Sequence, residues 1–517
     1  MPGDSTSRRR LNVPGRRLPV APWQDGARPK MGPGTKPGTM KHPGSPLRWR
    51  PQTTREGVHG TSKPTIVCAG MCNTKSAEIK YLAEQVAAQG GEPVVMDLSL
   101  GAAVDWADVS LAEVLASTGT RIEDVFAAPR AEAIELVGHA GAVKILELHA
   151  AGKCDGIISW AGSVGTTTAT RVMRALPFGV PKVMLTDMAS SDVSMWLGNK
   201  DIYIVNPTAE QGINVVTRKA VANAAAAVVA MALVPEVPPG SKPLAAITSY
   251  GSTTPTVLRC AEFLERRGWD VSVFHAVGVG ATMEDLIRSG LITAIVDVTP
   301  AELTNNLLGS VYGTPKTWEG ERLTAAAEMG IPQVVAPGGL DQAALGPLHS
   351  IPGRYLDDIR QGRRQSYHGT GLPYQHNDSV TIIIPTLEEV EQVSLEIARK
   401  LSDTRGPTAL VIPMRGWSAY DQGEESATLE RGWAAGNGDA PNWLPDPARP
   451  DWSLRATLML SVLREHLNLD NPNLDLLACD LHILDPEFAD LLNGCIGDML
   501  DHTWRKGMYR DVAEVIG

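Results

Sequence analysis

From Lys63 onward, short apolar segments alternate with segments whose apolar residues recur at helical spacing. The apolar segments, such as residues 65–70 and 156–160, are almost continuous and rich in Val and Ile. Continuous apolar strands separated by amphipathic helices are typical of a parallel sheet that helices cover on both faces. The pattern therefore predicts an α/β fold.

A Pro-rich linker at residues 234–243 divides the pattern into two parts. Residues 64–99 and 244–278 share one order: a strand, a Gly/Thr loop, a helix ending at Gly, and a strand. We therefore expect two related Rossmann-like lobes with parallel sheets, at residues 63–235 and 243–510. A polar, Gly- and Pro-rich stretch at about residues 420–451 is predicted to be a surface insertion. The second lobe is predicted to continue through apolar segments at residues 292–303, 331–341, 379–386 and 407–416.

Residues 1–62 have a different composition, with ten prolines and 12 Lys and Arg against 3 Asp and Glu. Such a segment cannot bury a core, so it is predicted to be a disordered extension. A transit peptide, or a true start of the protein at Met31 or Met40, are the alternatives.

The remaining residues are acidic, with 35 Lys and Arg against 55 Asp and Glu. An acidic body argues against nucleic acid or an anionic membrane as the main partner. The apolar run at residues 220–234 is short and Ala-rich, so we expect a buried helix there. Six scattered cysteines indicate neither a disulfide framework nor a zinc ribbon. These features predict a cytoplasmic protein with a small-molecule ligand.

Phosphate chemistry is suggested by a loop of small residues between a strand and a helix of the first lobe. Gly162 and Gly165 would let a ligand approach the backbone, while Ser163, Thr166 and Thr167 offer hydroxyl groups. The free N–H groups and the dipole of a helix N-terminus favour anions. A plain structural turn is the alternative.

Three residues at neighbouring strand ends could complete this site. Thr74 and Lys75 follow the first strand, and a lysine there can neutralise phosphate as a point charge. Asp97 closes the second strand, where a ribose-binding acid often lies. A solvated loop lysine and a helix-capping aspartate are the alternatives.

In the second lobe, His275, Asp341, His376 and His482 lie at or near predicted strand ends. Loops beyond the carboxyl ends of parallel strands gather at one edge of a sheet. We therefore expect at least two of these four side chains within reach of one another, as an acid/base or metal site in a cleft between the lobes. Each residue could instead be a hydrogen-bonded structural group.

The order of several segments resembles that of the Tm-one-like ATP-binding family. These segments are "NTKSAEIKYLAEQV", "GSVGTTTATRVMRALPFGVPKVMLTDMAS", "TTPTVLRCAEFLERRGWDVSVFHAVGVGATMEDLI", "GIPQVVAPGGLD" and "DLHILDPEFA". The resemblance covers about residues 63–492. It implies two Rossmann-like lobes, ATP bound in the first of them, and a homodimer. Mg²⁺ or another divalent metal is a further cofactor that we expect beside ATP.

Two functions are compatible with these features. One is an enzyme, a metal-assisted hydrolase or lyase with a reaction centre between the lobes. The other is a non-catalytic, nucleotide-gated binding or regulatory protein.

Overall fold

The computed structural model describes residues 63–235, 240–313, 322–423 and 442–513. The expected N-terminal extension, residues 1–62, lies outside the described residues, as does the middle of the expected insertion, residues 424–441.

The first lobe is a five-stranded, all-parallel sheet covered by helices. The strand order is β2-β1-β3-β4-β5. The strands are β1 (Thr65–Gly70), β2 (Glu92–Asp97), β3 (Gly156–Trp160), β4 (Lys182–Leu185) and β5 (Tyr203–Val205). The helices are α1 (Ser76–Ala88), α2 (Leu111–Ala116), α3 (Ile122–Ala127), α4 (Arg130–Ala150), α5 (Ser163–Ala175), α6 (Ser194–Leu197) and α7 (Val215–Ala232).

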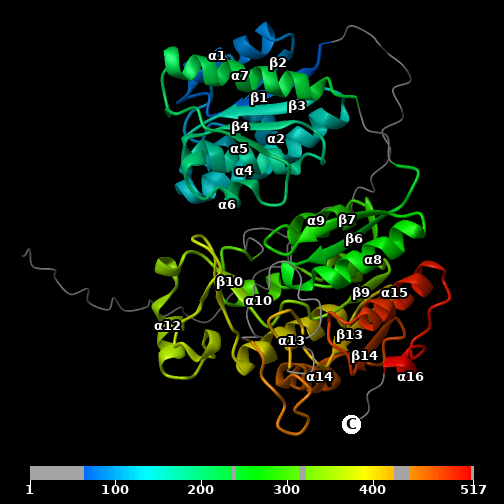
Figure 1. Cartoon of the computed structure of the whole chain (residues 1–517). Helices are drawn as coiled ribbons and strands as arrows, with labels where there is room; N and C mark the ends of the chain where they lie inside the picture. Colours follow the sequence, from blue (N-terminus) through cyan, green and yellow to red (C-terminus); the bar gives the residue numbers. More distant parts are fainter. Residues whose placement is uncertain (1–62, 236–239, 314–321, 424–441, 514–517) are drawn as a thin grey trace, which may run out of the picture. The chain divides into compact units, whose positions relative to one another are not determined.

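Successive side chains of a strand point to opposite faces, so a strand that is buried on both faces must be apolar throughout. In β1, Ile66 and Cys68 pack against α1 and α7, whereas Val67 and Ala69 pack on the opposite side. Figure 1 shows α1 and α7 on one side of this sheet, and α2, α4 and α5 on the other. The apolar runs of the sequence are thus explained by a three-layer lobe.

One helix in the described part, α7, is long and apolar enough to cross a membrane by length and composition. Its buried residues, including Val221, Ala225 and Val228, recur at helical spacing and belong to the core of the first lobe. A core helix of a globular domain passes the same test, so α7 is weak support for a membrane span. The sequence predicts a buried helix here, and α7 is buried only along the face that packs on the sheet.

The second lobe contains a six-stranded parallel sheet with the order β14-β13-β9-β8-β6-β7. Helices α8 and α15 share one hydrophobic core with this sheet, and α13 and α14 share another. The strands are β6 (Leu244–Ser249), β7 (Asp270–His275), β8 (Ile292–Asp297), β9 (Gln333–Val335), β13 (Thr408–Pro413) and β14 (Leu474–Cys479). The helices are α8 (Thr254–Arg266), α9 (Gly280–Arg288), α10 (Glu302–Leu307), α11 (Ala325–Met329), α13 (Leu387–Leu401), α14 (Leu454–His466), α15 (Pro486–Leu500) and α16 (Arg510–Ala513). Two parallel-sheet α/β lobes, as predicted from the sequence, are confirmed.

The structure also contains a small antiparallel sheet that the sequence analysis did not predict. The apolar segment at residues 379–386 supplies β12 (Thr381–Ile383), which pairs antiparallel with β10 (Ala343–Leu345) and β11 (Tyr374–Gln375). Helix α12 (Gly353–Arg360) contributes Tyr355 to the core of this unit. A short run of isoleucines suits either kind of sheet, so periodicity alone could not separate them.

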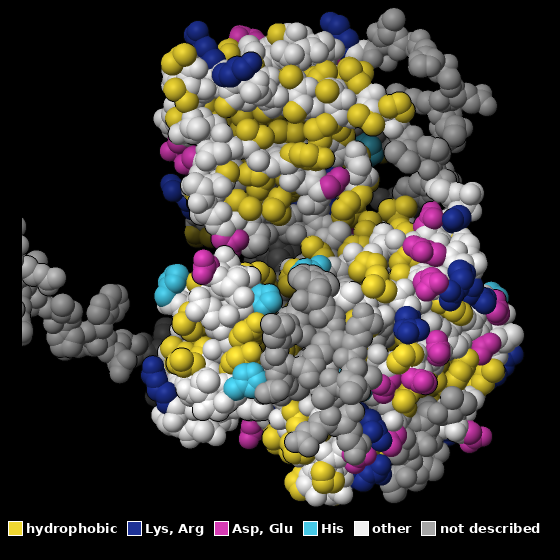
Figure 2. Space-filling view, viewed as in Figure 1, with side chains coloured by type: hydrophobic (Ala, Val, Ile, Leu, Met, Phe, Trp, Pro, Cys, Tyr) yellow, Lys and Arg dark blue, Asp and Glu magenta, His cyan; other side chains and the backbone are white. Residues whose placement is uncertain are grey.

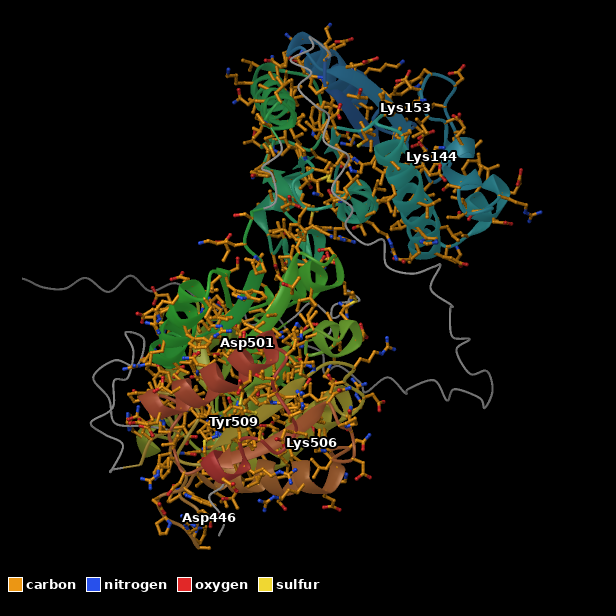
Figure 3. The ribbon with its side chains drawn as sticks, turned by 90° about the vertical axis from the view of Figure 1, so that its right-hand side faces the viewer. Lys144, Lys153, Asp446, Asp501, Lys506 and Tyr509 are labelled. Carbon is orange, nitrogen blue, oxygen red and sulfur yellow. The ribbon has the colours of Figure 1, made fainter. Side chains whose placement is uncertain are left out.

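The C-terminal residues close the second lobe through polar contacts to its own elements. Lys506 Nζ donates to the carbonyl of Asn471 at 3.0 Å, and the Tyr509 hydroxyl donates to the carboxylate of Asp498 on α15. Figure 3 shows Lys506 and Tyr509 beside this part of the second lobe.

Candidate functional site

The strand order of the first lobe defines a topological switch point between β1 and β3. From β1 the chain continues to β2 on one side, and then returns to β3 on the other side. The chain thus leaves these two central strands in opposite directions, and such a switch point at the carboxyl edge is where α/β sheets commonly bind ligands. The predicted residues Thr74 and Lys75 follow β1, and Gly162 follows β3, so the structure places them on the two sides of this switch point.

The loop after β1 is a tight turn that orients Lys75 into the lobe. The backbone N–H groups of Thr74 and Lys75 both donate to the carbonyl of Met71, at 3.1 and 2.9 Å. Thr74 is exposed, whereas Lys75 is only 5% exposed. Lys75 Nζ donates to the carbonyl of Glu210 at 2.6 Å and lies 3.7 Å from Glu210 Oε1. The lysine is therefore a buried cation and not a solvated loop residue.

Helix α5 begins at Ser163, inside the segment that was expected to be a loop. Gly162 is its extended N-cap, so Ser163, Gly165 and Thr166 lie in the first turn of the helix. The Thr166 hydroxyl donates to the Gly162 carbonyl at 2.8 Å, and the Thr167 hydroxyl donates to the Ser163 carbonyl at 2.9 Å. This back-bonding uses the threonine hydroxyls within the helix. The groups that α5 could offer an anion are therefore the N–H groups of its first turn and the hydroxyl of the exposed Ser163.

The two glycines of this segment have different structural roles. An ideal Cβ on Gly162 would lie 2.6 Å from Glu210 Oε1, so the missing side chain lets that carboxylate approach the start of α5. An ideal Cβ on Gly165 would lie 2.6 Å from the Cβ of Ala161 and 3.3 Å from Met71 Cγ. Gly165 is therefore required for close packing of its own turn, and Gly162 is the position where the Glu210 carboxylate comes close to the backbone.

Asp97, the expected ribose-binding acid, is fully buried at the end of β2. Its Oδ1 accepts from the backbone N–H and the hydroxyl of Ser99, and its Oδ2 accepts from the N–H of Val104. Ser99 in turn accepts from the N–H of Asn73 in the loop after β1. Asp97 thus fixes the loop after β2 and, through Ser99, the loop after β1, which borders the switch point.

In the second lobe, the structure separates the four predicted catalytic residues into two groups. Asp341 follows β9 and His482 follows β14, and both are completely buried. His275 ends the edge strand β7 and His376 follows β11, and both are exposed. Within the described ranges, no hydrogen bond or ion pair joins any two of these four side chains, and no group of three His, Cys, Asp or Glu could hold a metal ion.

Asp341 is the centre of a buried polar cluster at the carboxyl edge of the six-stranded sheet. Its Oδ2 accepts from the Ser418 hydroxyl at 2.7 Å and from the Asn442 amide at 2.8 Å. Its Oδ1 is buried without a hydrogen-bond partner among the described residues. Burial raises the pKa of Asp341, while the hydrogen bonds from Asn442 and Ser418 oppose that rise. Burial also raises the pKa of the neighbouring Asp421.

His482 adjoins the same cluster as a neutral imidazole. The N–H of Leu484 donates to Nδ1 at 3.1 Å, so the ring proton is on Nε2, which donates to the Asp421 carbonyl at 3.0 Å. Burial lowers the pKa of His482 to about 4. Both ring nitrogens are therefore engaged by the backbone, and the ring holds two loops together.

The two exposed histidines lie against aromatic rings. His275 meets the ring of Tyr250 edge-on at 5.7 Å, and partial desolvation of its ring lowers its pKa although the residue is exposed. His376 meets the ring of Tyr374 edge-on at 5.8 Å.

Sequence analysis did not identify Glu210 in the first lobe, or Ser418, Asp421, Asn442 and Arg455 in the second. Arg455, on α14, lies 3.6 Å from Asp421 Oδ1 and donates to the Asn442 carbonyl. The described ends of the expected surface insertion, Tyr420 to Gln422 and Asn442, are buried. A charged or amide residue in a stretch rich in Gly, Pro and Trp gives no periodic signal, so only the fold could reveal these positions.

Comparisons with known proteins assign the two lobes to one family. Residues 64–236 match the N-terminal domain of the uncharacterised protein family UPF0261, and residues 242–432 match its C-terminal domain. A UPF0261 protein of Clostridium tetani is 37% identical over 362 residues, which are 69% of this chain and 85% of that protein. The UPF0261 protein RA0729 of Rhizobium meliloti is 33% identical over 429 residues, which are 82% of this chain and 96% of that protein.

The ToMV susceptible protein tm-1(GCR26) of Solanum lycopersicum is a more distant relative. It is 26% identical over 461 residues, which are 84% of this chain and 55% of the tomato protein. The resemblance noted in the sequence is thus confirmed as distant homology to this tomato protein, whereas ATP binding stays a prediction. With both lobes matched in order and bacterial relatives covered over most of their length, the chain belongs to the UPF0261 family.

Proposed function

We propose that the first lobe binds the phosphate groups of a small phosphorylated ligand, ATP or a related nucleotide, at the β1/β3 switch point. The observation that carries this proposal concerns the Glu210 carboxylate. It lies close both to the buried cation Lys75 and to Gly162, the N-cap of α5. Helix α5 has 13 residues, and its N-terminus carries a partial positive charge. Both groups favour an anion in the same place.

Glu210 supports this proposal because its carboxylate occupies the position that a phosphate oxygen would take. Its side chain is 53% exposed, so it can leave without uncovering the core. A phosphate carries more charge than a carboxylate and has more acceptor atoms for N–H groups. If a ligand phosphate displaced the Glu210 carboxylate, Lys75 would therefore still have an anion as its partner.

The residues present fit a phosphate better than they fit a resident metal. Gly162 has no Cβ to obstruct the N–H groups of α5, and Lys75 supplies a positive charge. The described residues contain no group of acidic, His or Cys side chains that could hold Mg²⁺. In our proposal Mg²⁺ enters the site with the nucleotide, held chiefly by its phosphates, as is usual for this ion.

The placement of the four predicted acid/base residues favours a binding or regulatory role over catalysis. His275 and His376 are exposed whereas Asp341 is buried, and both nitrogens of His482 are engaged. A hydrolase or lyase of this chain would need other groups. Release of inorganic phosphate from ATP by the purified protein distinguishes the two roles.

We also propose that the protein is a homodimer. Strand β5 lies at one edge of the sheet of the first lobe, and its Tyr203 is 58% exposed. Val215, at the start of α7, is 87% exposed. Figure 2 shows hydrophobic side chains over much of one face of this lobe. Unpaired edges and exposed apolar residues are features of association surfaces. Light scattering of the protein as it elutes from a size-exclusion column measures its oligomeric state directly.

Calorimetric titration of the full-length protein with ATP, with and without Mg²⁺, tests the proposed ligand. Lys75→Ala should weaken binding by at least about tenfold, because a buried charge-assisted contact is lost. Lys153→Ala is the matched control, since Lys153 is an exposed lysine of the same lobe that precedes β3 at the opposite end of the strand (Figure 3). Equal affinities of the two variants would contradict the proposal.

A further inference from the structure

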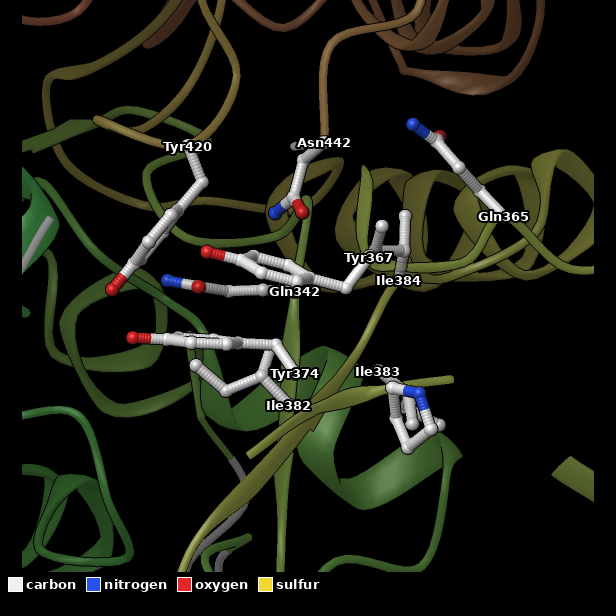
Figure 4. A pocket seen from close by; sticks show the side chains of 10 residues that line it. Gln342, Gln365, Tyr367, Tyr374, Ile382, Ile383, Ile384, Tyr420 and Asn442 are labelled. Atoms are coloured by element: carbon white, nitrogen blue, oxygen red, sulfur yellow. The ribbon is translucent and has the colours of Figure 1, made fainter. Parts of the chain in front are cut away.

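Buried polar atoms without a hydrogen-bond partner occur in both lobes, and what can satisfy each of them depends on its charge. Gln342 Oε1 is a neutral atom of this kind in the second lobe. Figure 4 shows Gln342 beside the rings of Tyr367 and Tyr374, which stack on each other with centroids 4.4 Å apart. The hollow between these side chains has room for about one water molecule, so a water can satisfy the amide.

Asp187, in the first lobe, presents a charged atom of this kind. The residue is half-buried, and its Oδ1 is buried without a hydrogen-bond partner among the described residues. The buried carboxylates of the second lobe differ, because Asp341 accepts two hydrogen bonds from side chains and Asp421 lies 3.6 Å from Arg455. A carboxylate oxygen that is removed from water without a partner is costly, so a cation beside Asp187 would be favourable.

The pairing of β3 with β4 places Asp187 at the proposed phosphate site. Trp160 pairs with Leu185 at the carboxyl ends of these strands, and the N–H of Ala161 donates to the Leu185 carbonyl at 3.0 Å. Two residues beyond this last pair, the same register brings Asp187 next to Gly162, the N-cap of α5.

A contact between side chains fixes the loop after β4 to the same helix. The hydroxyl of Thr166, in the first turn of α5, is hydrogen-bonded to the hydroxyl of Thr186 at 2.8 Å. Thr186 also accepts from the N–H of Met188 at 3.1 Å. The residues on both sides of Asp187 are therefore held to the helix whose N–H groups are proposed to bind phosphate.

We propose that Asp187 is a protein ligand of the Mg²⁺ ion that accompanies the nucleotide, an inference that rests on the proposed function of the first lobe. Mg²⁺ is usually held by one or two carboxylates together with phosphate oxygens and waters. A single carboxylate beside a phosphate site supplies the protein's part of that set. Without the metal, the same carboxylate would repel the phosphates. Asp187 therefore makes the site selective for the metal-bound form of the nucleotide.

Calorimetric titrations of the full-length protein with ATP, in excess Mg²⁺ and in excess EDTA, test this inference. We expect the wild type to bind ATP at least about tenfold more tightly in Mg²⁺ than in EDTA. Asp187→Asn should lower this ratio about fivefold or more, because it removes a metal ligand and a charge that repels metal-free ATP. Glu92→Gln should leave the ratio unchanged, since Glu92 is an exposed carboxylate at the amino end of β2, at the opposite edge of the same sheet.

The ratio separates this role from a merely structural one, which would weaken both forms of ATP alike. The inference is overturned if the wild type shows no preference for Mg²⁺, or if Asp187→Asn keeps the wild-type ratio. In both cases ATP still binds, so the phosphate site itself stands. If the wild type binds ATP in neither condition, the proposed function has failed and this inference with it. Thermal unfolding identifies a variant that has lost its fold, and Asp187→Ala, which removes the same carboxylate, then decides.

Discussion

The side-chain nitrogen of Lys75 lies 2.6 Å from the carbonyl oxygen and 3.7 Å from Oε1 of Glu210. The two residues are far apart in the sequence and meet only because the loop after β5 returns to the carboxyl edge of the sheet beside β1 and β3. In the proposed phosphate site, Glu210 would therefore act as an internal anion that pairs with Lys75. Its removal should make that site more available to a ligand.

Glu210→Gln should strengthen ATP binding by about fivefold, because a competing and repelling charge at the surface is worth about 1 kcal/mol. Glu84→Gln, at an exposed position of α1, is the matched control and should have no effect. The gain should shrink as salt is added, since salt screens charges at an exposed site. Weaker binding in Glu210→Gln would mean that Glu210 holds the ligand instead of competing with it.

Gly165→Ala should destabilise the protein by about 1–2 kcal/mol, even though alanine favours helix over glycine. A Cβ there would lie 2.6 Å from the Cβ of Ala161, and overpacking of this kind outweighs the helical preference. Gly353→Ala is the control, because no atom lies within 4 Å of a Cβ added to this helical glycine. Urea unfolding of both variants measures the difference. Equal stabilities would show that the turn relaxes freely.

His482 should make the protein less stable in acid. Its pKa is lowered to about 4 in the folded protein from an ordinary value of 6.5, so the unfolded chain takes up the proton first as the pH falls. Its contribution to stability is therefore present above pH 6.5 and is lost between pH 6.5 and 4. A shift of this size corresponds to about 3 kcal/mol for a fully buried group.

Comparison with His482→Gln isolates this effect, because glutamine can donate to the Asp421 carbonyl but takes up no proton. The carboxyl groups of Asp341 and Asp421, whose pKa values are raised, titrate in both proteins and cancel in the difference. The difference in unfolding free energy between wild type and variant should be smaller at pH 4.5 than at pH 7. A constant difference would show that His482 is protonated in the folded state too.

Much of the fold could be predicted because its parallel strands are apolar on both faces. Ile66 and Val67 pack on opposite sides of the sheet, and this produces the continuous runs seen in the sequence. The antiparallel β12 was missed because its isoleucines follow the same local pattern. The start of α5 was misplaced because Thr166 and Thr167 satisfy their hydroxyls inside the helix, although such residues usually indicate a loop.

The sites were less predictable because they depend on contacts between distant segments. Lys75 follows a central strand, and the topology alone brings it to the switch point. Glu210 lies in a loop without periodicity, and nothing local connects it to Lys75. Asp341 was identified at a strand end, but its partners Ser418 and Asn442 come from segments 77 and 101 residues further along the chain.

The central claim, that phosphate binds at the start of α5, is tested most directly by NMR of protein labelled with ¹⁵N-glycine and titrated with ATP and with inorganic phosphate. We predict that the amide signals of Gly162 and Gly165 shift with both ligands, and that those of Gly338 and Gly339, in the loop after β9 of the second lobe, do not. Unchanged signals of Gly162 and Gly165 at concentrations where ATP is bound would contradict the claim.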